Sequence, residues 1–272
     1  RDMASERRAQ LACFEQYEIP IASISEIKRH LLLSLKYNQH RGVICIVGEA
    51  GMGKSQIIHQ VAKESGRKIC DIRTAHFGLM GAGIPSIKDA KSEDHFKIKL
   101  PEIFPSKDEK VIVFFDEINQ GAPHALALFF SVIEDRRMFN YFLPEDALVV
   151  AAMNPNTAQY AVTQIENNAA LRRRLKWFHA LPHFKGWVRH AETETFHQGD
   201  EAALQGSKPC HPGILDFFRA KPDALDDHKA RNESKQYTCP ATVQTVSLDA
   251  YLMDEESIPL YGDFAMCRFA AS

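Results

Sequence analysis

A glycine-rich stretch that ends in a lysine and a serine has the residue types that bind a nucleoside triphosphate. It runs from Gly48 to Ser55, directly after the apolar residues 43–47, and a segment with helical periodicity follows it. Glycines let backbone N–H groups turn toward phosphate oxygens, Lys54 is suited to the β- and γ-phosphates, and Ser55 is suited to Mg²⁺. A helix that begins here directs its dipole at the anion. The expected nucleotide-binding residues are Gly48, Glu49, Ala50, Gly51, Met52, Gly53, Lys54, Ser55 and Gln56.

Two acidic residues, Asp116 and Glu117, follow a second apolar run at 110–115. Such a run is typical of a strand buried on both faces, and ligands of parallel sheets gather at the carboxyl ends of strands. Asp116 is therefore suited to hold Mg²⁺ through water, and Glu117 to orient and deprotonate the attacking water. Two acids can also begin an ordinary surface turn. The phosphate-binding loop earlier in the chain favours the catalytic interpretation.

A third polar residue, Asn154, follows the apolar run at 148–153 and precedes Pro155. Its amide is suited to hydrogen-bond the attacking water or the γ-phosphate. The alternative is an Asn-Pro turn that only ends a strand. Because two other motifs precede it in the expected order, the catalytic role is favoured.

Three consecutive arginines, Arg172, Arg173 and Arg174, lie at the end of a short predicted helix. They could form a solvated face, a nucleic-acid patch, or arginine fingers that stabilise phosphoryl-transfer charge in a neighbouring subunit. The residues themselves leave these three alternatives open.

Alternating strands and helices must position these groups. The pattern predicts an α/β fold, a P-loop NTPase with a parallel β-sheet flanked by helices. Residues 1–181 are expected to form the nucleotide-binding domain with a helical extension at 4–15, and residues 182–272 a small helical lid. Segment 78–108 is predicted to be a long excursion, either a solvated insertion or a partner-contacting loop. The strands are expected at 43–47, 68–73, 110–115 and 148–153, and the helices at 25–35, 56–65, 122–135, 187–193, 213–219 and 242–253.

Composition narrows the remaining function classes. The 272 residues carry a net charge of -2, which gives no whole-chain attraction to nucleic acid or membrane. The six cysteines are scattered without CxxC spacing, which argues against a zinc site and predicts reduced thiols. We find no signal peptide and no apolar run long enough to span a bilayer, so we expect a soluble, cytoplasmic protein. Because the chain begins with Arg1, we also expect that further residues precede it.

Taken in order, the motifs resemble those of AAA+ ATPases, and most closely the MoxR-like branch with its phage- and prophage-encoded members. The resemblance covers roughly residues 40–260. Leu171 to Leu175 resembles the family's Leu-Arg-x-Arg-Phe, which makes Arg174 the first arginine-finger candidate and Arg173 the second. The other matching segments are Gly48 to Ser55, similar to Walker A, Phe115 to Asn119, similar to Walker B, Ala152 to Pro155, similar to sensor 1, and the stretches Asp135 to Arg137 and Phe142 to Pro144.

The resemblance implies an ATPase that uses ATP and Mg²⁺ and forms a homo-oligomeric ring, usually a hexamer, in which ATP in one subunit meets Arg174 of the next. It also implies a chaperone that remodels a partner protein, commonly one with a von Willebrand factor A domain. One departure is Ala241, which stands where relatives carry a sensor-2 arginine. Either a nearby base such as Arg231 or Lys235 substitutes for it, or the coupling of hydrolysis to lid movement is altered.

Two other functions remain as alternatives. In a nucleic-acid motor or loader, the arginines and the lysines of segment 88–107 would contact phosphates, but acidic residues are interleaved with those lysines. In a nucleotide-gated scaffold, assembly rather than turnover would be the function. The absent sensor-2 arginine leaves room for a scaffold, whereas an intact Glu117 argues against it.

Overall fold

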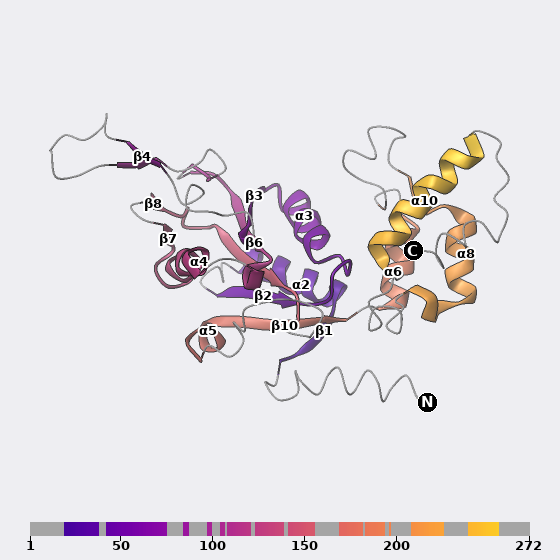
Figure 1. The fold of residues 1–272 in the computed structure, drawn as a ribbon, viewed down its shortest axis with the longest axis horizontal. Helices are drawn as coiled ribbons and strands as arrows, with labels where there is room; N and C mark the ends of the chain where they lie inside the picture. Colours follow the sequence, from indigo (N-terminus) through magenta and orange to yellow (C-terminus); the bar gives the residue numbers. More distant parts are fainter. Residues whose placement is uncertain are drawn as a thin grey trace. The chain divides into compact units, whose positions relative to one another are not determined.

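The chain divides into two compact units, residues 1–49 with 54–180 and residues 50–53 with 181–272. Each unit is described by itself (Figure 1). The predicted helix at 4–15 and the candidates Arg231 and Lys235 lie outside the described residues. In this computed structural model the described residues are 19–37, 42–74, 84–86, 97–99, 104–106, 108–120, 123–138, 141–155, 169–181, 183–193, 196, 208–225 and 239–255.

A six-stranded sheet forms the centre of the first unit, in the order β1-β10-β2-β9-β6-β3. The pairings β10–β2, β2–β9, β9–β6 and β6–β3 are all parallel, which confirms the predicted parallel sheet. Strand β3 does not pair with β2, which precedes it along the chain, because β9 and β6 lie between them. The strands are β1 (Ile21–Ser23), β2 (Val43–Val47), β3 (Lys68–Arg73), β6 (Val111–Asp116), β9 (Leu148–Met153) and β10 (Leu175–Leu181).

Helices cover both faces of this sheet, as Figure 1 shows. Helices α2 (Ile24–Lys36) and α3 (Lys54–Ser65) pack on the face that carries Ile44. Helices α4 (Pro123–Asp135) and α5 (Ala169–Arg174) pack on the face that carries Cys45. Neighbouring residues of β2 therefore point to opposite cores. This explains why each central strand reads as a continuous apolar run rather than an alternating one.

Several features differ from the predicted elements, among them the short strand β1, which was not predicted. The excursion at 78–108 contains an antiparallel hairpin of β4 (Ile84–Ser86) and β5 (Lys97–Lys99). A second hairpin, β7 (Arg137–Met138) with β8 (Tyr141–Phe142), follows α4. Strand β10 was not predicted, because the arginine-rich helix α5 ends at the residue where the strand begins. The large apolar residues Leu175, Trp177 and Phe178 after the arginines were the sequence signal that could have found it.

The second unit is helical, as predicted, with α6 (Phe184–Ala191), α8 (Pro212–Ala220), the 3-10 helix η6 (Pro222–Leu225) and α10 (Pro240–Glu255). Trp187 packs edge-to-face on Phe196 and Phe218, with ring centroids 6.1 and 5.6 Å away. Trp187 therefore packs against the apolar core of this unit. Across the described parts of both units, no helix is long and apolar enough to cross a bilayer.

Candidate nucleotide-binding site

The site lies at the carboxyl ends of β2, β9 and β6, which are neighbours in the sheet. Val47, the last residue of β2, is in register with Met153, the last residue of β9. The Gly48 N–H donates to the Met153 carbonyl at 3.1 Å, so the loop that begins at Gly48 is fixed to the strand that ends before Asn154. Because β9 is inserted between β2 and β6, Asn154 comes between the phosphate-binding loop and the acidic pair.

Lys54, the first residue of α3, is the centre of the loop. Its side chain is buried, and its ammonium donates to the carbonyls of Gly48 and Glu49 at 2.7 and 2.8 Å. It also donates to Asn154 Oδ1 at 3.1 Å. A buried charge is stable only when it is paired or hydrogen-bonded, so these oxygens hold the lysine in the loop. Lys54 and Asn154, predicted from separate motifs, are therefore in direct contact.

The glycines of the loop have two different roles. Gly51 and Gly53 have φ angles of 77° and 86°, in the left-handed region where only glycine is unstrained. Gly48 is needed for another reason, since a Cβ atom there would lie 3.2 Å from the Cβ of Ala180 on β10. The loop thus requires glycine both for its turns and for its close approach to the neighbouring strand.

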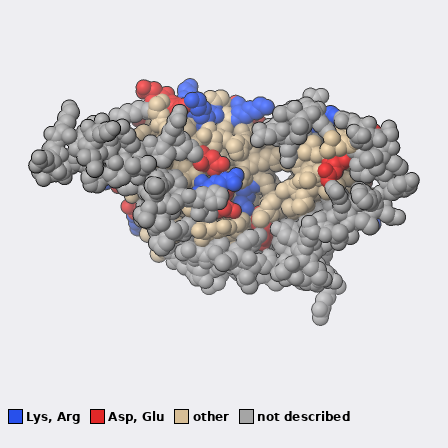
Figure 2. Space-filling view, turned by 45° about the horizontal axis from the view of Figure 1, so that its top comes forward, with Lys and Arg blue, Asp and Glu red and all other residues tan. Residues whose placement is uncertain are grey.

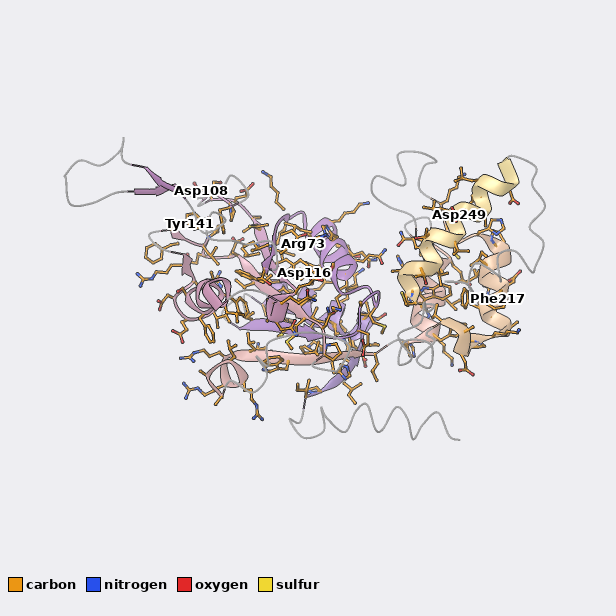
Figure 3. The ribbon with its side chains drawn as sticks, in the orientation of Figure 1. Arg73, Asp108, Asp116, Tyr141, Phe217 and Asp249 are labelled. Carbon is orange, nitrogen blue, oxygen red and sulfur yellow. The ribbon has the colours of Figure 1, made fainter. Side chains whose placement is uncertain are left out.

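Ser55 and Asp116 form the candidate Mg²⁺ site. The Ser55 hydroxyl donates to Asp116 Oδ2 at 2.8 Å, and Asp116 Oδ1 accepts the Glu117 N–H at 2.9 Å. Hydroxyl and carboxylate oxygens are the hard ligands that Mg²⁺ prefers, so this pair fits the ion. Figure 3 labels Asp116 together with Arg73, its partner in register on β3.

Glu117 has an unusual backbone conformation. Its φ angle of 53° lies in the left-handed region, which is strained for a residue other than glycine and is frequent at functional sites. The buried hydroxyl of Thr74 lies 3.0 and 2.6 Å from the carbonyls of Asp116 and Glu117, within donating distance of both. Thr74 was missed in the sequence, where nothing but its place after β3 distinguishes it. It ties the catalytic candidate Glu117 to the neighbouring strand.

Asn119, in the 3-10 helix η4 (Ile118–Gln120), connects the acidic pair to Asn154. It is fully buried, and its side-chain amide donates to the Asn154 carbonyl at 2.7 Å. The sequence placed Asn119 in a motif only through the family resemblance. The structure gives this residue a contact that fixes the ends of β6 and β9 relative to each other.

Two ionisable side chains around the site have shifted pKa values. Burial raises the pKa of Asp71 on β3, and the negative charge of Asp116 raises it further. Burial lowers the pKa of His179 to about 4, and this residue pairs with Val47 immediately before the loop. This edge of the sheet therefore holds a neutral histidine and closely spaced carboxyl groups, whose charge a divalent cation would offset.

The arginine candidates are not brought to this site within one chain. Helix α5 precedes β10, and Leu175 is in register with Val43 at the opposite, amino end of β2. Five residues of β2 separate that end from the loop, about 13 Å along a parallel strand. Instead, Arg174 forms an ion pair with Glu134 of α4, with 2.9 Å between Nη2 and Oε1. Arg173 is exposed.

One comparison with known proteins, the match to a protein-family model, agrees with this geometry. Residues 44–163 match the family described as "ATPase family associated with various cellular activities (AAA)". No curated protein was found to match the chain. Fold and site together define a P-loop nucleoside triphosphatase. The family match is more specific: residues 44–163 resemble an AAA ATPase domain, which supports an ATPase activity.

Solved structures resemble the chain only distantly. The RuvB Holliday junction branch migration motor of Thermotoga maritima is 17% identical over 83% of this chain and 68% of its own, with a TM-score of 0.43. A putative ATPase from Cytophaga hutchinsonii is 13% identical over 90% and 67%, with a TM-score of 0.41. NtrX from Brucella abortus is 12% identical over 91% and 55%, with a TM-score of 0.47. Because all three scores are below 0.5, the AAA assignment depends on the family match and the site.

Proposed function

We propose that this chain is a MoxR-like, ATP-driven remodeller of a partner protein that works as a homo-oligomeric ring. The observation that supports a ring is the distance between Arg174 and the phosphate-binding loop of the same chain. Helix α5 and the phosphate-binding loop lie at opposite ends of the sheet in one chain. In a ring, α5 of a neighbouring copy can approach the loop instead. The site is then complete only between two subunits.

In the proposed mechanism each part of the site has one role. Lys54 binds the β- and γ-phosphates, and Ser55 and Asp116 would hold Mg²⁺, which neutralises phosphate charge when bound. Glu117 orients the attacking water and accepts its proton, and the Asn154 amide hydrogen-bonds that water or the γ-phosphate. Phosphoryl transfer needs positioning and charge stabilisation more than covalent chemistry, and the buried contacts of Lys54 and Asn154 supply the positioning.

The arginine contacts are compatible with a role in trans. The side chains of Arg174 and Glu134 are 32% and 42% exposed. An ion pair this exposed contributes little to stability, so exchanging Glu134 for a phosphate in the next subunit costs little. Arg173, also exposed, is the second candidate.

The described part of one face supports a protein partner rather than nucleic acid. Among the described residues, Figure 2 shows acidic and basic side chains interspersed on one face rather than a continuous basic surface. A nucleic-acid groove would be lined by one sign of charge. The partner is therefore expected to be a protein, and one with a von Willebrand factor A domain is the first candidate to test.

Complementation between two inactive variants tests the shared site. Arg174→Ala lacks the finger but keeps its own acidic pair, and Glu117→Gln lacks the base but keeps its finger. Mixing them creates interfaces that join an intact Glu117 to an intact Arg174. The ATPase rate of the mixture should exceed that of either variant, and the wild-type rate should rise steeply with protein concentration.

One control mixture and three outcomes distinguish the alternatives. Mixing Arg174→Ala with the double variant Arg174→Ala/Glu117→Gln should restore nothing. No recovery in the first mixture, together with a wild-type rate that does not depend on concentration, would overturn the trans-acting arginine. Stimulation by DNA that weakens with salt would replace the protein-remodelling function by a nucleic-acid motor, and absent hydrolysis at every concentration would favour the scaffold.

A further inference from the structure

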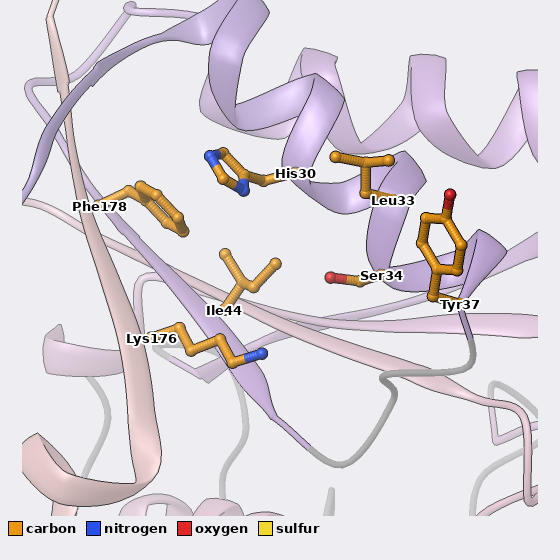
Figure 4. Close-up of a pocket in the computed structure, with 7 residues that line it drawn as sticks. All are labelled: His30, Leu33, Ser34, Tyr37, Ile44, Lys176 and Phe178. Carbon is orange, nitrogen blue, oxygen red and sulfur yellow. The ribbon is translucent and has the colours of Figure 1, made fainter.

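A cavity that is open to solvent lies in the first unit, between α2 and the strands β2 and β10 (Figure 4). Four of its lining residues, His30, Leu33, Tyr37 and Lys176, are exposed, and Ser34 and Ile44 form its buried floor. Its volume is about 230 Å³. Its walls include Ile44, near the amino end of β2, whereas the phosphate-binding loop begins at Gly48 beyond the carboxyl end. The cavity therefore lies apart from the nucleotide site, toward the other end of the same strand.

The cavity is framed by one stripe of the helix and one face of the sheet. On the strands, Lys176 is in register with Ile44, and Phe178 follows two residues later, so all three point to the same face. On the helix, residues three and four apart form a single stripe that faces them. The members of this stripe are His30, Leu33, Ser34 and the helix cap Tyr37.

Polar atoms converge in this cavity. Ser34 is 8% exposed, and Figure 4 shows its hydroxyl and the Lys176 ammonium directed into the same space. His30 adds an imidazole whose ring centroid lies 5.0 Å from that of Phe178. A few convergent polar groups in an otherwise apolar recess are the usual features of a small-molecule site.

Charge and size define the ligand that fits. The described lining contains a lysine and a histidine but no aspartate or glutamate, so it favours an anion. Leu33, Ile44 and Phe178 supply apolar contacts, and the Phe178 ring can pack against a planar group. Pockets for drug-sized ligands measure about 300–1,000 Å³. At about 230 Å³ this one admits a compound with a single ring rather than a nucleotide.

We infer that this cavity is a second ligand site, which binds a small aromatic carboxylate independently of ATP. The carboxylate accepts hydrogen bonds from Lys176 and Ser34, and the ring packs on Phe178 between α2 and the sheet. A charged ligand is held mainly by the lysine, because charge-assisted hydrogen bonds are the stronger kind.

Benzoate is the probe for this site, and ligand-detected NMR titration of the purified chain is the measurement. We expect saturable binding to the wild type, a loss of about tenfold in affinity in Lys176→Met, and a loss of about fivefold in Ser34→Ala. Lys63→Met removes an exposed lysine of α3 that does not line the cavity, so its affinity should equal that of the wild type. Benzyl alcohol, which has the ring without the charge, should bind at least tenfold more weakly.

Several results would overturn this inference. They are the absence of saturable benzoate binding to the wild type, equal affinity in Lys176→Met, equal affinity for benzyl alcohol, and displacement of benzoate by ATP with Mg²⁺. Displacement would place benzoate in the nucleotide site. A loss of ATPase activity in Glu117→Gln has no bearing on benzoate binding, so the two proposals fail separately.

Discussion

The carboxyl and amino ends of the same parallel sheet are built in different ways. At the carboxyl end Lys54 and Asn119 are buried and hydrogen-bonded to residues of other loops, and Asn154 accepts from both. At the amino end Arg173 is exposed and Arg174 is partly exposed. The candidate groups at the carboxyl end are held in place by buried hydrogen bonds before a ligand binds. The arginines at the amino end are more exposed and can exchange their contacts.

Glutamate-to-glutamine changes at the two ends should have very different effects on hydrolysis. Glu117→Gln removes the proposed base, and kcat should fall by about 10²–10⁴-fold with ATP affinity unchanged. Glu134→Gln, which alters only the exposed partner of Arg174, should change kcat by less than threefold or so. Steady-state ATPase assays measure kcat and nucleotide titrations measure ATP affinity for the two variants. Equal losses would contradict the assignment of Glu117.

Substitution of one lysine at each end of the sheet should have different effects on ATP affinity. Lys54→Ala removes the ammonium that the loop directs at the phosphates, and the Kd for ATP should rise by about 10²–10³-fold. Lys176→Met, at the amino end, should leave this Kd within about twofold of the wild-type value. Fluorescence titration with an ATP analogue distinguishes them. An unchanged Kd in Lys54→Ala would remove the basis of the nucleotide site.

Acid should destabilise the first unit through His179. Burial lowers its pKa to about 4, whereas an unfolded histidine has a pKa near 6.5. Between these values the unfolded state binds the additional proton, so the free energy of unfolding falls as the pH falls, by about 3 kcal/mol in total. Urea denaturation between pH 7 and pH 4 measures this slope.

The matched variants are His179→Gln and His59→Gln. His179→Gln should remove this part of the slope, and His59→Gln, which alters an exposed histidine of α3, should keep it. A slope that survives in His179→Gln would show that another group is responsible.

Asn119 provides the smallest expected effect. Asn119→Leu keeps a similar size but leaves the buried carbonyl of Asn154 without this donor, which should cost about 1–3 kcal/mol of stability. Because the ends of β6 and β9 then shift, kcat should fall by about tenfold with KM nearly constant. If stability falls while kcat stays at the wild-type value, Asn119 has a structural role only. An exposed residue at the amino end, Arg173, should show no loss of stability on change to Ala.

The sequence by itself predicted the candidate site residues and the buried strands. The spacing of Lys54 and Ser55 and the apolar runs before Asp116 and Asn154 are local patterns, and local patterns fix element type and motif. The parallel sheet, the central strands and the helical second unit were predicted for this reason. The family match over residues 44–163 agrees with the ATPase assignment.

Only the tertiary structure decided which strand lies beside which. The insertion of β9 between β2 and β6 brings Asn154 to Lys54, and no local pattern encodes strand order. The same order brings the Thr74 hydroxyl to the Glu117 carbonyl, and it places Arg174 at the opposite end of the sheet from the loop. Strand order depends on long-range packing of both sheet faces, which is a property of the whole core, so the sequence motifs could not reveal it.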